Sequence, residues 1–188
     1  MISDELNELI RPVVLVQKLI WFIIVGSIIF YIGFVYFFTG ENKAISSPDI
    51  SYLQPLIYIL ASLSVLGSIF YYRYALSESK LNQFMTKDVD IQSLVMNPRT
   101  KEIDSDKLAK LKSLSDRDTK IYSLMFELQK ITIIVLILNE VTAILGSVLA
   151  FVNDDAAKIV PFAIASLVLS FWMFPRHMPL IKKADSLN

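Results

Sequence analysis

The 188 residues carry 18 basic and 18 acidic side chains, so the formal net charge is zero, and 54% of the residues are hydrophobic. The balanced charge argues against a nucleic-acid-binding protein, and a mean hydropathy of +0.53 is too high for an ordinary soluble domain. The absence of cysteine excludes a disulfide framework and a thiolate metal site.

Four apolar segments follow one another along the chain, and Glu140 is the only formal charge inside them. They span residues 19–40, 50–72 and 131–153, with 22 or 23 residues each, and 159–175, with 17 residues. A helix of about 20 apolar residues crosses a bilayer, and 17 residues reach about 26 Å. We therefore predict an all-α, multi-pass membrane protein with four transmembrane helices. Because the start MISDELNELIRP is acidic and lacks a cleavage site, the first segment is expected to be a retained span rather than a signal peptide.

The two halves of the chain share sequence features, which predicts two similar helical hairpins in parallel orientation. The matching positions are Gln17-Lys18 with Gln129-Lys130, Pro55 with Pro161, Ala-Ser-Leu at 61–63 with Ala-Ser-Leu at 165–167, and Arg73 with Arg176. Chance recurrence of letters in apolar segments is the alternative. We divide the chain into a first hairpin at 1–77, a polar cytoplasmic connection at 78–119, and a second hairpin with a cytoplasmic tail at 120–188.

The connection between the hairpins is polar and mixed in charge. Its segments SESKLNQFMTK and DSDKLAKLKSLSDRD predict short amphipathic helices, and Asp104 or Ser105 can cap the second of them. Asn97-Pro98 predicts a turn between these helices. Because apolar residues are few, we expect no core here, but either a solvated extension of the neighbouring spans or a docking site for a partner. Asp116 and Asp118 are expected to be solvated charges.

The basic residues are unevenly distributed around the predicted spans. Of the 18, only Lys43 and Lys158 fall between spans one and two or between spans three and four. The positive-inside rule then places both termini and the connection in the cytoplasm. We expect a multi-pass protein of a bacterial-type inner (plasma) membrane, with the lipid bilayer as its first partner.

Small residues recur at helical spacing within the predicted spans. Steps of three, four and seven place each set on one face of its helix, where close backbone approach drives helix association in lipid. The predicted helix-packing residues are Gly26, Gly33, Ala143, Ser147, Ala150, Ser166 and Ser170.

Glu140 is the leading candidate for a functional residue. It lies about 15 to 20 Å along the helix from either charged boundary of its span, near the middle of a bilayer. An ionised group there is expensive, so such a residue is a functional-site hypothesis. In a structural interpretation the carboxyl is protonated and bonds a hydroxyl on a neighbouring span. The possible partners are Ser27, Tyr31, Ser64 and Ser68. In a functional interpretation it binds and releases a proton or cation.

The segment NEVTAILGSVLAFV resembles the carboxylate-bearing helix of the rotary-ATPase proteolipid subunits. In both, an acidic residue is followed by small residues, by an Ile step to Gly, and by a run of Val, Leu and Ala. The matching residues are Glu140, Ala143, Ile144, Gly146, Val148, Leu149 and Ala150. The resemblance implies that Glu140 is the carrier carboxylate, and four spans in two hairpins are similar to the duplicated form of that family.

Motifs for catalysis are not apparent in the sequence. His177 is the only histidine, and we find no phosphate-binding glycine loop, no nucleophile–base pair and no carboxylates with metal-ligand spacing. We therefore expect no enzyme, no cofactor and no metal. The predicted function is that of a non-enzymatic membrane subunit that assembles with itself or with other membrane subunits. The alternative is a proteolipid-like subunit that translocates protons or ions through Glu140.

Overall fold

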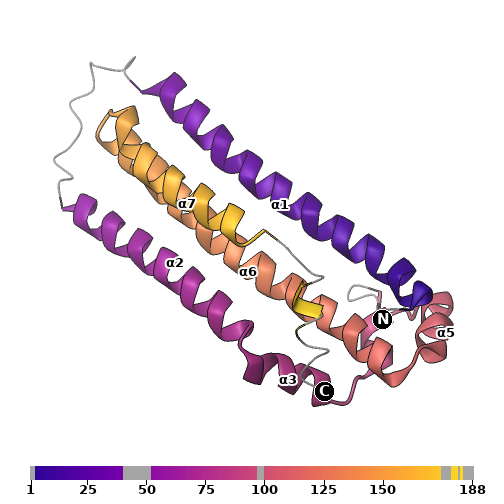
Figure 1. Cartoon of the computed structure of the whole chain (residues 1–188). Helices are drawn as coiled ribbons and strands as arrows, with labels where there is room; N and C mark the ends of the chain where they lie inside the picture. The colour runs from indigo at the N-terminus through magenta and orange to yellow at the C-terminus, as the bar shows by residue number, and fades with distance from the viewer. Residues whose placement is uncertain (1–2, 40–51, 97–99, 175–178, 182, 184–188) are drawn as a thin grey trace. The chain divides into compact units, whose positions relative to one another are not determined.

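The computed structural model describes residues 3–39, 52–96, 100–174, 179–181 and 183. Its helices are α1 (Asp4–Phe38), α2 (Leu53–Ala75), α3 (Glu78–Thr86), α4 (Ile91–Val95), α5 (Ser105–Ser113), α6 (Asp116–Val152), the 3₁₀ helix η1 (Ala156–Ile159) and α7 (Val160–Trp172) (Figure 1). Among these residues, β geometry is confined to a single bridge between Met96 and Ile103. The predicted all-α fold is therefore confirmed.

Three of the helices, α1, α2 and α6, are long and apolar enough to cross a membrane. This finding confirms the prediction of a helical membrane protein at that level. A shorter apolar helical stretch, Ala156–Trp172, corresponds to the fourth predicted span. The fourth crossing and the arrangement as two hairpins remain predictions.

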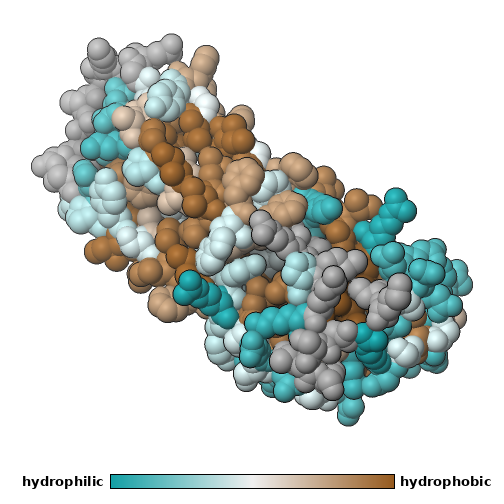
Figure 2. Space-filling model, viewed as in Figure 1, coloured by the Kyte–Doolittle hydropathy of each residue, from teal (hydrophilic) through white to brown (hydrophobic). Residues whose placement is uncertain are grey.

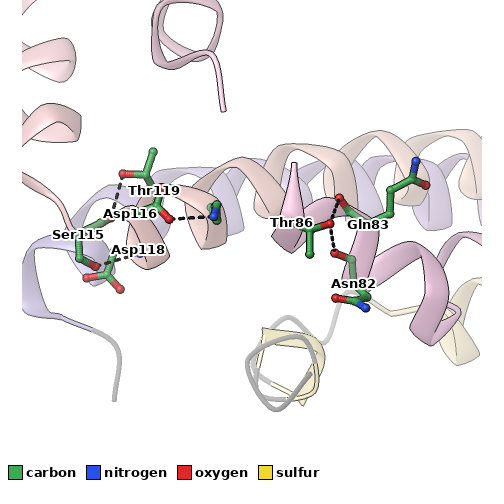
Figure 3. Close-up of polar contacts among 8 residues, drawn as sticks. Asn82, Gln83, Thr86, Ser115, Asp116, Asp118 and Thr119 are labelled. Atoms are coloured by element: carbon green, nitrogen blue, oxygen red, sulfur yellow. Dashed lines mark hydrogen bonds and ion pairs between the residues drawn. The ribbon is translucent and has the colours of Figure 1, made fainter. Parts of the chain in front are cut away.

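Two of the long helices begin well before the predicted spans. Ser115 starts α6 because its hydroxyl accepts the backbone N–H of Asp118 at 3.1 Å, while the Thr119 hydroxyl donates to its carbonyl at 3.1 Å (Figure 3). A serine that accepts an N–H from the first turn satisfies a group that the helix leaves unpaired. No proline or glycine follows until Gly146, so nothing interrupts the helix at the polar boundary.

The chain divides into two compact units that cut across the sequence-based division into hairpins and connection. Unit 1 comprises Met1–Gln17, Tyr74–Ile131 and Arg176–Asn188, and unit 2 comprises Lys18–Arg73 and Thr132–Pro175. Each unit therefore combines segments that are far apart in the sequence.

Unit 1 has a buried apolar core that the polar composition of the connection did not predict. Its buried side chains come from the starts of α1 and α6 as well as from α3, α4 and α5. They include Leu6, Ile10, Leu81, Met85, Val95, Leu111, Ile121, Leu124 and Met125. The connection lacks enough apolar residues for its own core, but it shares one with the first turns of two long helices. The expectation of a fully solvated linker is therefore wrong.

Polar contacts hold the N-terminus within unit 1. The Ser3 hydroxyl donates to the carboxylate of Asp118 at 2.8 Å, and Glu8 pairs with Lys110 at 3.7 Å. Asp118 is only 8% exposed, so its expected role as a solvated charge is wrong. Asp104 caps α5, as predicted, by accepting the backbone N–H of Lys107 at 3.1 Å.

Unit 2 contains the apolar parts of α1, α2 and α6 together with α7, and hydrophobic side chains cover much of its surface in the region of these helices (Figure 2). Its interior holds two apolar clusters. One joins α1 to α6 and α7 through Trp21, Ile24, Val25, Ile28, Val35, Leu136, Ala143, Ala150, Ile159 and Ala163. The other joins α2 to α6 and α7 through Ile57, Ala61, Leu149 and Phe162. Helix α6 thus packs against all three other helices of the unit.

The predicted small-residue packing holds for α6 and α7 but not for α1. Ala143, Ala150, Ser166 and Ser170 are fully buried, and Ser147 is half-buried. Gly26 and Gly33 are exposed, and a Cβ built on either one meets no heavy atom within 4 Å. Neither glycine therefore packs against another helix of this chain among the described residues, and their role in packing between subunits stays a prediction.

Helix α1 packs through a different face from the one that carries its glycines. Trp21, Ile28 and Val35 are buried and recur every seven residues, so they define its packed face. Each glycine stands two residues before Ile28 or Val35, which is about 200° around the helix. The helix packs through bulky side chains and turns its glycines outward.

Candidate functional site

Glu140 accepts hydrogen bonds from two hydroxyls of α1. Ser27 Oγ lies 2.7 Å and Tyr31 Oη 3.1 Å from the same carboxyl oxygen, Oε1. Ser27 and Tyr31 are four residues apart and therefore share one face of α1. Glu140 is half-buried. The structure thus brings two of the four predicted partners to the carboxyl, where they connect α6 to α1.

Ser27 has a second short contact. Its Oγ lies 2.7 Å from the backbone carbonyl oxygen of Ile24, one turn earlier on the same helix. Serine hydroxyls in apolar helices commonly return to a carbonyl in this way. Ser27 therefore lies between two oxygen atoms at equal distance, the carbonyl of Ile24 and the carboxyl of Glu140.

The other two predicted partners do not bond to Glu140. Ser68, on α2, is fully buried and donates to the side-chain oxygen of Asn139 at 2.7 Å. Ser64 is half-buried one turn earlier on α2. Within the part of the chain that the structure describes, Glu140 is hydrogen-bonded to Ser27 and Tyr31. Of the four predicted hydroxyls, those of Ser27 and Tyr31 therefore contact Glu140, and that of Ser68 contacts the neighbouring Asn139.

Asn139 forms the centre of a second polar cluster, which the sequence did not identify as a site. Its amide nitrogen donates to the Ser170 hydroxyl at 3.3 Å, and the Ser166 hydroxyl donates to its backbone carbonyl at 2.6 Å. With the bond from Ser68, this buried residue links α2, α6 and α7. The available signal was an asparagine in an apolar run together with two serines four residues apart on α7.

Trp21 adds a further link between α1 and α7. Its indole N–H donates to the backbone carbonyl of Ser170 at 2.8 Å. The last carbonyls of a helix lack partners within the helix, and Ser170 lies in the last turn of α7. The buried indole therefore fixes α1 against α7 at the end where α7 stops.

Gly146, a residue of the proteolipid-like segment, lies at a close contact between α6 and α7. A Cβ built on Gly146 would lie 2.5 Å from Cβ of Phe162. This distance leaves no room for any larger residue. Ala143 and Ala150 belong to the same side of α6, so the spacing of three and four residues was the available signal for this contact.

No charged partner accompanies Glu140 among the described residues. Along the helices of unit 2, Lys18 lies nine residues before Ser27, and Arg73 lies five residues after Ser68. Arg73 instead lies over the ring of Trp172, 6.0 Å from its centre. The part of the chain that the structure describes also contains no group of three or more His, Cys, Asp or Glu residues that could hold a metal ion.

Unit 1 contains a separate hollow of about 530 Å³ beside Tyr122, and its lining includes Met96, Asp104 and Lys107. Burial raises the pKa of Tyr122, against the opposing effect of the Lys107 charge. Asp104 and Lys107 form an ion pair at 3.1 Å and so bond to each other. The charges of Asp104 and Lys107 are therefore paired with each other, and the hollow, which Glu102 also lines, is a weaker candidate than the polar residues of α6.

The repeated Ala-Ser-Leu triplets occupy different environments. In the first, Ala61 is buried and Ser62 is exposed, whereas in the second, Ala165 is half-buried and Ser166 is fully buried. The matching letters therefore lie on different faces of α2 and α7. Comparison with known proteins gave no match to a protein-family model, to a curated protein or to a solved structure.

Proposed function

We propose that this protein is a non-enzymatic, four-span membrane subunit that assembles with itself or with other membrane subunits. The observation that carries the proposal is the apolar surface that unit 2 leaves uncovered. In the most apolar window of α2 only 17% of the residues are buried, against 44% for α6. A face of this kind, on a helix long enough to span, is expected to contact lipid or another apolar helix.

The fourth span in this proposal is Ala156–Trp172. It is short, but its polar side chains are satisfied inside unit 2, because Ser166 donates to Asn139 and Ser170 accepts from it. Its remaining face carries Ile164, Val168 and Phe171, which are all more than half exposed. A helix with one hydrogen-bonded seam and one apolar face suits a position between protein and lipid.

The proposed topology places both termini and the polar residues of unit 1 in the cytoplasm. The natural sequence contains no cysteine, so single-cysteine variants report one position each. With a membrane-impermeant thiol reagent on intact cells, Lys43→Cys should react, whereas the exposed Ser79→Cys should react only after permeabilisation. The opposite pattern would refute this topology.

Assembly can be tested with the same approach on α2. Leu63 is 60% exposed and Ala61 is 5% exposed, and both lie near the middle of the helix. If copies of the chain associate through α2, Leu63→Cys should give a cross-linked dimer in native membranes and Ala61→Cys should not. Gentle purification of the tagged chain tests for other subunits. A chain that neither cross-links nor retains a partner would contradict the proposed assembly.

The second candidate function is a proteolipid-like subunit that moves protons or ions through Glu140. The observation in its favour is that this mid-helix carboxyl is only half-buried and is contacted by hydroxyls rather than by a fixed cation. Proton flux in reconstituted vesicles tests it. Glu140→Gln should abolish flux if the carboxyl carries protons, whereas unchanged flux would exclude this function.

A further inference from the structure

We propose that unit 1 contains a binding site for the headgroup of a zwitterionic phospholipid, one that carries a phosphate and a primary ammonium group. The site is a hollow of about 550 Å³, and its lining comes from the end of α3, the segment that follows it, α4 and α6. It is a different hollow from the one beside Tyr122, although Phe126 lines both. The inference rests on the proposed placement of this chain in a bilayer, and it adds a specific lipid to the general contact with the membrane.

The hollow has an apolar part and a charged part. Phe84 from α3 and Phe126 from α6 are half-buried in its lining, whereas Lys87, Asp88 and Lys130 are exposed. A hollow of this size that combines apolar side chains with a few polar groups is typical of a site for a small ligand. A phospholipid has the same division, because its charged groups lie at one end of an apolar body.

The polar groups of this lining differ in whether they already have partners. Lys130 pairs with Glu127 at 2.7 Å, so their charges offset each other. Among the described residues, neither Lys87 nor Asp88 has an ion-pair partner, and the side-chain hydroxyl of Ser123 has no hydrogen bond. The hollow therefore offers a cation, a carboxylate and a hydroxyl to a ligand.

The formal charges of the lining indicate which kind of headgroup fits. Two lysines and three carboxylates, those of Asp88, Asp90 and Glu127, line the hollow, which leaves one net negative charge. A purely anionic headgroup would be repelled by this excess, and a purely cationic one would leave Lys87 without a partner. A phosphate bound by Lys87 and Ser123, together with an ammonium that donates to Asp88, satisfies all three groups.

The position of Lys130 indicates that the ligand is a lipid. This residue lines the hollow and immediately precedes the predicted span 131–153, in which Glu140 is the only formal charge. A lysine at the end of an apolar helix extends its ammonium to the headgroup level of the bilayer. In the proposed topology the hollow therefore meets headgroups of the cytoplasmic leaflet, and we commit to a phospholipid rather than to a soluble zwitterion.

Lipid retention by the purified full chain tests this site. The chain is placed in detergent micelles with equal amounts of phosphatidylethanolamine and phosphatidylglycerol that carry the same acyl chains, and native mass spectrometry counts the lipids that stay bound. The natural chain should retain phosphatidylethanolamine in preference to phosphatidylglycerol, whose headgroup has a phosphate but no ammonium. Glycerophosphoethanolamine, which has the headgroup without acyl chains, should not displace the lipid at equal concentration.

Two substitutions separate the phosphate contact from the ammonium contact. Lys87→Gln should weaken the binding of both lipids about fivefold, which is the change expected when one ionic contact at an exposed position is lost. Asp88→Asn should weaken the binding of phosphatidylethanolamine alone and so remove the preference. Lys112→Gln and Asp106→Asn are matched controls that should change neither, because both residues are exposed on α5 and neither lines the hollow.

Several results would overturn the proposal. One is a natural chain that shows no preference or prefers phosphatidylglycerol. Another is Lys87→Gln with no more effect than Lys112→Gln, or Asp88→Asn that keeps the preference. Displacement of the lipid by glycerophosphoethanolamine would identify a soluble zwitterion as the ligand instead.

Thiol labelling in membranes separates a failure of this site from a failure of the proposed function, since labelling reports insertion and topology whatever lipid is bound. A chain that labels as predicted but shows no lipid preference refutes the site alone. A chain that is not inserted refutes both.

Discussion

Asn139 and Glu140 are neighbours on α6, yet they serve different sides of the helix. Successive residues differ by about 100° around a helix, so one side chain meets α2 and α7 while the other meets α1. Asn139 is fully buried and bonds to serines of both α2 and α7. Glu140 is half-buried and bonds to two hydroxyls of α1 alone.

The difference shows how one helix uses two kinds of polar group. An amide cannot ionise and offers both donors and acceptors, so it suits an enclosed network in which every group is paired. A carboxyl can gain or lose a proton, and here it occupies the less enclosed side. Seven residues further along α6, Gly146 lies on the same side of the helix as Asn139, and Ser147 lies on the same side as Glu140. We infer that the packing of α6 against α2 and α7 tolerates substitution less well than its packing against α1.

The largest expected effect comes from removing the amide. Asn139→Leu would leave Ser68, Ser166 and Ser170 next to an apolar side chain, and two of these hydroxyls would lose their side-chain partner. A buried polar group without a partner costs about 1 to 3 kcal/mol, so we expect unfolding in mixed micelles to become easier by about 3 kcal/mol. Titration with a denaturing detergent measures this change. A loss no larger than that of Glu140→Leu would refute the distinction between the two sides.

The second prediction compares substitutions at Gly146 and Ser147, which lie seven residues after Asn139 and Glu140. Gly146→Ala places a methyl group where Phe162 already lies, and its Cβ would be 2.5 Å from that of Phe162. Overpacking costs about 1 to 3 kcal/mol, so we expect a loss of about 2 kcal/mol together with a separation of α6 from α7. Ser147→Ala is the control on the other side and should change the stability by less than about 0.5 kcal/mol. Equal effects of the two substitutions would contradict the division.

These contrasts also show what the sequence could and could not predict. The apolar runs predict membrane-spanning helices, because about 20 consecutive apolar residues have few other stable arrangements. The predicted position of Glu140 within its span follows from the number of residues between it and the charged residues at either end. Which face of a helix packs is less certain, since both a stripe of glycines and a stripe of bulky residues recur every seven positions. On α1 the bulky stripe of Trp21, Ile28 and Val35 is buried, and Gly26 and Gly33 are not.

The core of unit 1 was missed for a related reason. The connection taken alone has too few apolar residues to exclude water. Leu81, Met85 and Leu111 are nevertheless fully buried, and the same unit buries Leu6 and Met125 from the starts of two long helices. A shared core depends on tertiary proximity between distant segments, which no local pattern in one sequence reveals.

A smaller effect is expected on the α1 side of the comparison. Glu140→Leu removes both hydrogen bonds to α1, but Ser27 keeps its bond to the Ile24 carbonyl, and Tyr31 lies on a half-exposed surface. Interhelical hydrogen bonds in membranes contribute about 0.6 kcal/mol each on average, so a loss of about 1 kcal/mol is expected in the same detergent titration. Glu140→Gln keeps a donor and an acceptor and should lose less than half of that amount.

The smallest effect concerns Asp104, an exposed carboxylate at the start of α5, outside both polar clusters of α6. The backbone and side-chain hydrogen bonds from Lys107 hold the pKa of Asp104 below its ordinary value. A lowered pKa means that the capping contribution is fully present above the ordinary value and is lost as the pH falls through the lowered one. Hydrogen exchange of the α5 amides, corrected for the intrinsic pH dependence, should therefore lose protection in acid, and Asp104→Asn should remove that pH dependence while retaining a cap. Because Asp104 caps α5 and not α6, the amides of α6 around Asn139 should keep their protection through the same acid titration. A parallel loss of protection in α6 would mean that acid unfolds the whole protein instead of removing the cap of α5.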